Sequence, residues 1–370
     1  MYPQVRFFPV SNGDTTLIEA GGYVVLTDVN YRDACTDDNE EAYDFAPELR
    51  DACRRTNQRY ELDVFVLTHP DKDHLGGASK LLHLNSPDIY HPDADDPLIL
   101  VREMWVSPYA LNAHETEFSK PVLQEIRRRQ RLQGTSDGER DGNRLKVLSA
   151  DGNELAGRVG PALAWRLLAP TNEEATIPLP DPNDADAAPP SCNDSSLVIC
   201  WTLYCGQAKG HLLLAGDAGV DVWERIWDEY QADPDSVRWH VLLAPHHCSR
   251  SPMARKDEET GEYTYSPNAL AALGQVEGDG FVVSSSKPVK RDDDNPPSWE
   301  AKQRYLTILR KANPQNVERR FLNPESHNNG KPAPVVFELT EAGLRRKVPE
   351  KVAKPVLAVT LGASRPSTYG

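Results

Sequence analysis

The sequence predicts a layered α/β fold, in which helices lie outside a sandwich of strands, and two observations lead to it. Short apolar runs of the buried-strand type cluster in the first third of the chain and again between residues 196 and 284. Segments with helical spacing lie between and after these clusters, which is the order expected when helices cover layers of sheet. The 30 prolines in 370 residues also favour strands and turns over long helices.

The first third of the chain is expected to hold several strands and a short helix. The predicted strands are Val5–Pro9, Thr15–Ala20, Tyr23–Asp28 and Asp63–Thr68. The second and third of them flank a Gly-Gly pair, which is typical of a β-hairpin. The fourth is apolar throughout, as in a strand buried on both faces, and it ends at His69. A short helix is expected over Ala46–Asn57.

The rest of the chain continues the alternation of strands and helices. The predicted strands are Ala162–Leu168, Ser196–Trp201, His211–Ala215, His240–Ala244, Phe281–Ser284, Val335–Leu339 and Val356–Val359. The predicted helices are Lys120–Leu132, Val220–Tyr230 and a helix that Ser298 caps and that runs to about Lys311. We expect a single domain over residues 1–370. Within it we expect an inserted helical and loop region over about 85–150, a Pro- and acid-rich loop over about 171–192 and a C-terminal strand extension over about 313–370.

Composition limits the classes of function. The chain has 56 Asp and Glu against 41 Lys and Arg, a formal net charge of −15, which argues against a broad basic surface that coats nucleic acid. A local phosphate site stays compatible with this charge. No apolar run approaches the roughly 18 residues of a membrane span, and the start lacks the pattern of a signal peptide. The six scattered cysteines lack metal-type spacing and indicate reduced thiols of a cytoplasmic protein.

One helix carries a cluster of positive charge. Arg127, Arg128, Arg129 and Arg131 lie within five positions of the helix predicted over Lys120–Leu132. A solvated helix face is the favoured interpretation. The alternative is a patch that binds nucleic acid or a protein partner beside a cleft.

A dense group of metal-binding residue types follows the strand that ends at His69. His69, Asp71, Asp73 and His74 fall within six positions, directly before Gly76-Gly77. A tight loop at a strand end points several side chains at one spot. Imidazole nitrogen and carboxylate oxygen are ligands for divalent cations, so this loop is a candidate metal site.

Two later segments add candidates of the same type. Asp217 follows a short apolar strand and a glycine, a position suited to bridging metals, although an Asp that caps the next helix explains it about as well. His246 and His247 form a pair at the end of another apolar strand. One of the pair is expected to bind metal while the other faces substrate or a neighbouring carboxylate.

Together these segments resemble the metallo-β-lactamase-fold superfamily, and within it the hydrolase domain of ComEC-type competence proteins. The HxHxDH motif is present in its HxDxDH variant as His69-Pro70-Asp71-Lys72-Asp73-His74. The GD element corresponds to Ala215-Gly216-Asp217, and the PHHGS element to Pro245-His246-His247-Cys248-Ser249. Three weaker similarities accompany these motifs. Asn193–Val198 resembles the start of a family strand, Asn12-Gly13-Asp14 resembles the family's GxGD turn, and Leu26-Thr27-Asp28 resembles a family strand end. The resemblance as a whole spans about residues 5 to 310.

The resemblance implies a four-layer αββα metallo-β-lactamase sandwich with metal ligands on loops along one edge. It implies a divalent metal cofactor, Zn or Mn, as one or two ions. The implied ligands are His69, Asp71, Asp73, His74, Asp217, His246 and His247. His69 and Asp71 would bind the first ion, and Asp217 would bridge the two ions. Asp73, His74 and one of the histidine pair would serve the second ion.

The sequence departs from the family pattern at four places. Asp71 stands where most members have His, and Cys248 replaces the Gly of the PHHGS element. The later HP element is represented by Asn295-Pro296-Pro297, without His. For the middle ligand position, between residues 75 and 216, the nearest histidines are His114 and His211, and neither has the expected neighbours. We therefore expect the first metal position to be the less complete one, and the metal choice to move from zinc alone towards manganese or a mixture.

The function implied by the resemblance is hydrolysis by metal-activated water, most directly as a phosphodiesterase or nuclease acting on DNA or RNA. Asp73 would orient the water, and a free His of the 246/247 pair would donate a proton or hold developing negative charge. Further residues expected to bind substrate are Asn193, Ser196, Ser249 and Arg250. A strand-start turn and a surface salt bridge explain Asn193, Ser196 and Arg250 equally well.

Two other functions remain open from the sequence. One is hydrolysis of a small ester, lactone or thioester. The other is a non-catalytic scaffold of the same fold that binds a partner, which the incomplete ligand set favours and the His69–His74 cluster opposes. A protein partner, in a multi-protein system such as antiphage defence, is a further hypothesis, and no membrane partner is expected.

Overall fold

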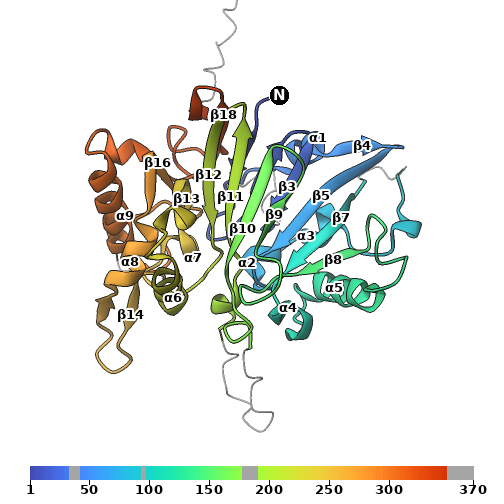
Figure 1. Ribbon diagram of the computed structural model, residues 1–370, viewed down its shortest axis with the longest axis horizontal. Coiled ribbons are helices and arrows are strands. Elements are labelled where there is room, and N and C mark those ends of the chain that lie inside the picture. Colours follow the sequence, from blue (N-terminus) through green and yellow to red (C-terminus); the bar gives the residue numbers. More distant parts are fainter. Residues whose placement is uncertain (33–41, 93–96, 177–190, 293, 348–370) are drawn as a thin grey trace, which may run out of the picture.

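Two mixed sheets pack face to face with helices on both outer sides in the computed structural model, which describes residues 1–32, 42–92, 97–176, 191–292 and 294–347 (Figure 1). The first sheet is ten-stranded, and its main path runs β19 (Gly343–Lys347), β18 (Val335–Thr340), β1 (Gln4–Phe7), β2 (Thr16–Ala20), β3 (Tyr23–Thr27), β5 (Arg59–Leu67), β7 (Ile99–Val106) and β6 (Leu82–His83). Beside this path, β4 (Arg54–Thr56) pairs with β5, and β8 (Arg144–Val147) pairs with β7.

The second sheet is seven-stranded. Its order is β17 (Phe321–Leu322), β16 (Val276–Val283), β13 (Trp239–Leu243), β12 (Ala208–Leu214), β11 (Val198–Cys205), β10 (Leu163–Ala169) and β9 (Ala156–Arg158). A separate hairpin consists of β14 (Ala254–Lys256) and β15 (Tyr263–Tyr265). In this sheet β12, β13, β16 and β17 are parallel to one another, so their carboxyl ends lie at the same edge.

Helices occupy the outer layers and the loops at the sheet edge. They are α1 (Ala46–Ala52), α2 (Lys72–Leu75), α3 (Ala78–Leu81), α4 (Tyr109–Asn112), α5 (Lys120–Leu132), α6 (Val220–Tyr230), α7 (Pro245–Cys248), α8 (Pro267–Leu273) and α9 (Trp299–Ala312). Short 3₁₀ turns are η2 (Pro87–Ile89), η3 (Asn193–Ser195), η4 (Pro234–Val237) and η5 (Val317–Arg320). Among these helices none combines the length and the apolar character of a membrane span.

The central strands separate three apolar layers, which explains why their sequences are apolar throughout. In β5, Val66 faces the core between the sheets and Phe65 faces the outer helices. In β12, Leu212 faces the inner core and Leu213 faces the helices of the other side. Successive side chains of a strand point to opposite faces, so a strand covered on both faces needs apolar residues at every position. The four-layer αββα order expected from the sequence is confirmed.

The inner layer is held by large aromatic side chains from both sheets. Trp105 of β7 and Trp201 of β11 stack with ring centroids 5.8 Å apart and an interplanar angle of 8°. Trp165 of β10 lies 5.0 Å from Trp105. All three are buried, and burying such rings is among the largest apolar contributions a residue makes. This packing holds the sheets rigidly together behind the edge where the polar loops gather.

Most predicted elements are present within a few residues of their expected ends, and two predictions need correction. Helix α1 stops at Ala52, because Asn57 and Gln58 adopt positive φ and turn the chain so that β4 pairs with β5. The region 85–150, expected as inserted helix and loop, supplies β7 and β8 to the first sheet; β7 lies beside β5 over seven residue pairs. The C-terminal strand extension agrees with the prediction over the described residues, where it adds β17 to one sheet and β18 and β19 to the other. The predicted strand Val356–Val359 and most of the loop over 171–192 lie outside the described residues.

The arginines of α5 are largely engaged within the protein. Arg129 is fully buried and donates to Glu125 at 2.6 Å, and Arg128 donates to the same carboxylate at 2.7 and 2.8 Å. Arg127 pairs with Glu115. The cluster therefore fixes α5 to its neighbours and is not a free basic face.

We expect Glu125→Ala to destabilise the protein by about 3–5 kcal/mol, because it leaves the buried Arg129 guanidinium without its counter-charge. Glu115→Ala removes the partly exposed partner of Arg127, which lies on the same helix as Arg129. It is expected to lower the free energy of unfolding by less than about 1 kcal/mol. Urea unfolding monitored by circular dichroism measures both. Equal losses for the two variants would contradict this assignment.

Candidate metal centre

The candidate site lies where the carboxyl ends of strands from both sheets meet. The loop after β3 carries Asp28, and the loop after its parallel neighbour β5 carries His69 to His74. The loops after β12 and β13 carry Asp217 and the 246/247 pair. The Leu197 N–H donates to the Thr68 carbonyl at 3.1 Å and ties the two sheets together at this edge. Residues up to 178 positions apart, His69 and His247 among them, are thereby brought to one place.

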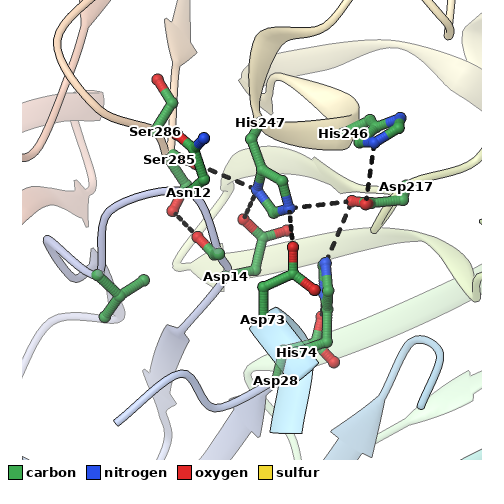
Figure 2. Close-up of polar contacts among 12 residues, drawn as sticks. Asn12, Asp14, Asp28, Asp73, His74, Asp217, His246, His247, Ser285 and Ser286 are labelled. Carbon is green, nitrogen blue, oxygen red and sulfur yellow. Dashed lines mark hydrogen bonds and ion pairs between the residues drawn. The ribbon is translucent and has the colours of Figure 1, made fainter. Parts of the chain in front are cut away.

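Asp217 is the hub of this edge. It is buried, and its carboxylate lies 3.2 Å from His74 Nε2 and 3.5 Å from the Nε2 atoms of both His246 and His247 (Figure 2). It also lies 3.9 Å from His69 Nε2. Donor atoms of Asp14, His74, Asp217 and His247 all lie within 4.8 Å of one another, which makes them the first group able to hold a cation.

Asp28 and Thr68 orient His74. Asp28 accepts from the Thr68 N–H at 2.8 Å and from the Thr68 hydroxyl at 2.7 Å, and its other contact is His74 Nδ1 at 2.9 Å. Because Nδ1 is held from behind, Nε2 is aimed at Asp217 (Figure 2). A carboxylate behind a ligating histidine is the usual way to fix its ring and raise its basicity.

The histidine pair is presented by an unusual backbone. His246, His247 and Cys248 all have positive φ, of 49°, 51° and 66°. Non-glycine residues rarely adopt this left-handed region, and strained backbone clusters at functional sites. The turn directs His247 Nε2 to Asp73 at 3.1 Å and its Nδ1 to the Ser285 carbonyl at 3.2 Å, while His246 faces Asp217 from the more exposed side.

Gly216 is required for the placement of Asp217. Its φ is +49°, and a Cβ at this position would lie 2.7 Å from the Thr68 hydroxyl oxygen and 3.0 Å from that of Ser196. The resemblance placed a glycine–aspartate pair here. The structure gives its physical reason, because a side chain here would be strained and would collide with Thr68 and with Ser196, whose hydroxyl contacts His69 and accepts from the Asp217 N–H.

His69 belongs to a second group. It is fully buried, and its Nδ1 contacts the hydroxyls of Thr68 and Ser196 at 3.2 Å each. Its Nε2 lies 3.7 Å from Asp71 Oδ2. Donor atoms of His69, Asp71 and Cys192 all lie within 4.8 Å of one another.

Two residues of these groups were missed as site candidates by the sequence reasoning. Cys192 was read only as a scattered thiol, since it lies 121 positions from Asp71 and has no local motif. Asp14 was noted only as part of a turn similar to the family's GxGD. Its Oδ1 lies 3.5 Å from His247 Nδ1, so that similarity was the available signal (Figure 2).

The charges of these histidines and carboxylates compensate one another. Burial opposes a charge on His247, yet Asp217, Asp14 and Asp73 raise its pKa to about 10. Burial likewise opposes a charge on His74, and Asp217 and Asp28 nevertheless raise its pKa well above the ordinary value. Burial alone would raise the pKa of Asp217, but His247 and His74 hold it well below its usual range. Protonated His74 and His247 thus supply the positive charge that balances the surrounding carboxylates.

The remaining ionisable groups differ in state. Burial lowers the pKa of His69 to about 3, so its Nε2 keeps a free lone pair. Burial acts against the charge of Asp73, but its hydrogen bond to His247 brings its pKa down to about 2. Burial and the neighbouring Asp71 raise the pKa of the Cys192 thiol far above its ordinary value.

The donor atoms fit a divalent cation. His69 Nε2 is buried at this edge without a hydrogen-bond partner, and Asp14 Oδ1, His74 Nε2 and Asp217 Oδ1 are engaged only in ion pairs within the site. A buried polar atom without a partner is costly, so the open position of His69 Nε2 needs an explanation. Imidazole nitrogens and carboxylate oxygens at these separations are ligands for zinc and similar ions, so the residues present match the metal that the resemblance implied.

The residues expected to bind substrate lie in different surroundings. Asn193 is in η3. The Ser196 hydroxyl contacts His69 and accepts from the Asp217 N–H at 3.1 Å, which makes it a support for both groups. Ser249 is buried and bonds to Ser251, and the Arg250 guanidinium lies over the Tyr263 ring at 4.0 Å. The Ser249 N–H donates to the His246 carbonyl at 2.8 Å, and its hydroxyl partner Ser251 bonds to His246 Nδ1 at 2.6 Å, so Ser249 supports the histidine turn.

Neither histidine considered for the middle ligand position reaches the site. His114 is exposed in the loop before α5. His211 lies towards the start of β12, with His240 and Glu277, whereas Asp217 follows that strand. The Glu277 carboxylate lies 3.2 Å from Arg238, whose positive charge disfavours a cation there.

Metal binding should release protons. A cation that binds between Asp217 and the histidines displaces the protons of His74 and His247, because ligating imidazole must be neutral. We therefore expect the apparent metal affinity to rise with pH from 6 to 9. Calorimetric titrations in two buffers of different ionisation enthalpy measure the release, and a binding enthalpy independent of buffer would contradict it.

The same shifts have a consequence for the metal-free protein. A histidine whose pKa is raised on folding contributes stability that is fully present below its unfolded pKa of about 6.5. For His247 this contribution is lost as the pH rises through about 10. Metal-free protein should therefore lose stability from neutral to alkaline pH, and loaded protein should lose less.

The fold and the site define an αββα protein with a buried histidine–carboxylate centre. No protein-family model and no curated protein matches the chain. Among solved structures it is similar to Igni18, a metallo hydrolase from the hyperthermophilic archaeon Ignicoccus hospitalis, at 14% identity and a TM-score of 0.38, covering 90% of this chain and 99% of that one. It is similar to Tm1679, a metal-dependent hydrolase of the β-lactamase superfamily, at 11% identity and a TM-score of 0.38, covering 87% and 96%.

A third similar structure is the isothiocyanate hydrolase from Delia radicum gut bacteria. The identity is 13%, the TM-score is 0.37, and 86% of this chain and 96% of that chain are covered. Identities and TM-scores this low leave the function to be inferred from the residues of this chain.

Proposed function

We propose that the protein is a metal-dependent hydrolase that cleaves phosphodiesters, with a nucleic acid as the substrate class. The observation that carries the hydrolase part is the convergence of the donor atoms of Asp14, His74, Asp217 and His247, beside those of His69 and Asp71. A divalent cation bound there lowers the pKa of water from near 16 to about 7 and so supplies a nucleophile at neutral pH.

The substrate class is inferred from the cavity next to Asp73. This cavity of about 970 Å³ is lined by Asp73 and by four basic side chains: Arg32, Lys72, Lys80 and Lys287. Glu117 is the other acidic residue of the lining, so positive charge exceeds negative charge around it. In a protein of net charge −15, a local excess of Lys and Arg beside the candidate centre favours an anionic substrate.

One aromatic side chain adds to this inference. Phe118 lines the same cavity and is 39% exposed, which is unusual for a large apolar residue. Basic side chains interleaved with an exposed aromatic ring suit a single-stranded nucleic acid, because phosphates pair with the cations and a base stacks on the ring.

Two side chains beside the centre would orient the attacking water and stabilise the leaving group. Asp73 is partly exposed, stays ionised at neutral pH and lies at the border of the cavity and the centre, where it can orient the attacking water. His246 keeps its side chain 23% exposed and is held by Ser251 at 2.6 Å. Its position suits a hydrogen bond to negative charge that develops on the leaving oxygen.

The test is a substrate panel on metal-loaded protein. Single-stranded DNA, RNA, bis-p-nitrophenyl phosphate and a p-nitrophenyl ester are each supplied with Zn or Mn. Turnover of the phosphodiesters is expected. Turnover of the ester alone would assign the small-ester alternative, and metal binding without any turnover would assign the scaffold alternative.

Reversing one charge in the cavity should separate substrate binding from chemistry. We expect Lys287→Glu to raise KM for single-stranded DNA by about tenfold or more, since a charge-assisted contact is worth about 1.5–3 kcal/mol, while kcat changes little. Lys290→Glu is the matched control, because Lys290 is exposed three positions away and does not line the cavity. Equal KM changes in both variants would contradict a role for the cavity.

A further inference from the structure

The metal position that His69 and Asp71 would serve lacks an obvious third ligand by sequence, and the structure places a thiol there. Cys192 is 5% exposed and its Sγ lies 3.0 Å from Asp71 Oδ1. His69, Asp71 and Cys192 offer three donor atoms within 4.8 Å of one another. This is the place for which His114 and His211 were the nearest candidates by sequence.

A second observation points to a ligand at this spot. His69 is fully buried, its Nδ1 is held by two hydroxyls, and its Nε2 has no hydrogen-bond partner although it faces Asp71 at 3.7 Å. Leaving such a buried nitrogen without a partner is destabilising. An ion shared with Asp71 and Cys192 would satisfy it.

The thiol is held in position by a hydrogen-bonded turn. The Cys192 carbonyl accepts from the Ser195 N–H at 3.0 Å and from the Ser195 hydroxyl at 2.7 Å. In the same turn, Asp194 accepts from the Gly219 N–H at 3.1 Å, which ties the turn to the loop that carries Asp217. The turn thus fixes Cys192 relative to both candidate groups.

No other described cysteine lies at the centre. Cys248 follows the histidine pair, but its Sγ points to the Ser298 carbonyl at 3.9 Å and packs in the apolar layer under α9. Cys200 is buried in the same layer from β11. Cys248, although it follows the histidine pair in the sequence, is therefore not the cysteine placed at the centre.

We propose that Cys192 is a thiolate ligand, completing a His69–Asp71–Cys192 site for the first of two ions. On binding, the Sγ–H bond breaks, the proton passes to solvent, and sulfur keeps the electron pair that it shares with the cation. One neutral imidazole, one carboxylate and one thiolate carry two negative charges, which balance a divalent ion. A thiolate selects zinc or cobalt over manganese, so the two positions differ in metal preference, and the first is not the weaker one.

The test uses Co²⁺, whose bond to a thiolate produces a strong charge-transfer absorption in the near ultraviolet. Wild-type protein titrated with Co²⁺ should develop this band, and Cys192→Ser should lose it. Cys200→Ser is the matched control, a buried cysteine eight positions away, and it should keep the band. Affinity for the first zinc should fall more than about 100-fold in Cys192→Ser, because even partners behind the ligands change affinity 10–100-fold.

A second measurement uses wild-type protein, so the test of Cys192 does not depend on whether the Cys192→Ser variant folds. X-ray absorption of zinc-loaded wild-type protein should show a sulfur at about 2.3 Å. Cobalt binding without the band, or zinc without sulfur, would overturn the Cys192 assignment and leave the proposed hydrolase intact. This inference rests on the metal-binding part of the proposed function, so wild-type protein that binds neither ion would overturn both.

Discussion

Asp217→Asn is expected to abolish both metal binding and hydrolysis. Asp217 is the residue whose carboxylate lies within 4 Å of all four histidines of the centre, so its replacement removes the charge that both groups share. Metal affinity should fall more than about 100-fold, which exceeds the 10–100-fold effect typical of residues behind the ligands. The rise in melting temperature that metal gives wild-type protein should disappear with it.

The metal-free variant should also be less stable. The pKa of Asp217 is held well below its usual range by His247 and His74, so its contribution to stability is present at neutral pH and is lost only in acid. In Asp217→Asn the two histidines lose that counter-charge. Circular dichroism and melting temperature, with and without zinc, measure these effects. Asp221→Asn, whose carboxylate is exposed on α6, serves as control, and a wild-type metal response in Asp217→Asn would refute the assignment.

Asp73→Ala should remove hydrolysis while leaving the fold intact. Asp73 bridges the centre and the basic cavity, since its side chain is 37% exposed and it contacts His247 at 3.1 Å. Loss of the residue that orients the water should reduce kcat by more than about 100-fold. Its main-chain carbonyl, which accepts from the Asp14 N–H at 3.0 Å, remains in the variant, so the loop geometry is retained.

The stability of Asp73→Ala reflects two opposing effects. Removing one carboxylate relieves repulsion with Asp217 and Asp71, but it also removes the pairing with His247 that holds the pKa of Asp73 at about 2. We therefore expect a modest loss in metal-free protein and a larger one in metal-loaded protein. Turnover of single-stranded DNA and melting temperature with and without Mn measure both. Asp51→Ala on the exposed side of α1 is the control, and wild-type turnover in Asp73→Ala would place the activity elsewhere.

The sequence by itself determined the elements and a layered α/β class, and the resemblance that its motifs carry implied the four-layer order. Apolar runs such as Asp63–Thr68 predict strands buried on both faces, and the structure has β5 at this place between two apolar layers. The helix over Lys120–Leu132 and the Ser298 cap of α9 follow from spacing and capping chemistry that act within a few residues. Local rules of this kind are readable in a single chain, and so is the compact His69–His74 motif.

Only the tertiary structure decided what gathers around that motif. Cys192 and Asp14 lie far from it in sequence, and they reach it because the starts of β2 and β11 lie at the edge where β5 ends when the two sheets pack. The same packing buries Glu125 and Arg129 as an ion pair. It also brings four basic side chains to one cavity: Arg32, Lys72, Lys80 and Lys287. Contacts between distant residues leave no periodic or local signal, because they depend on sheet order and register, and these are set by the packing of the whole core.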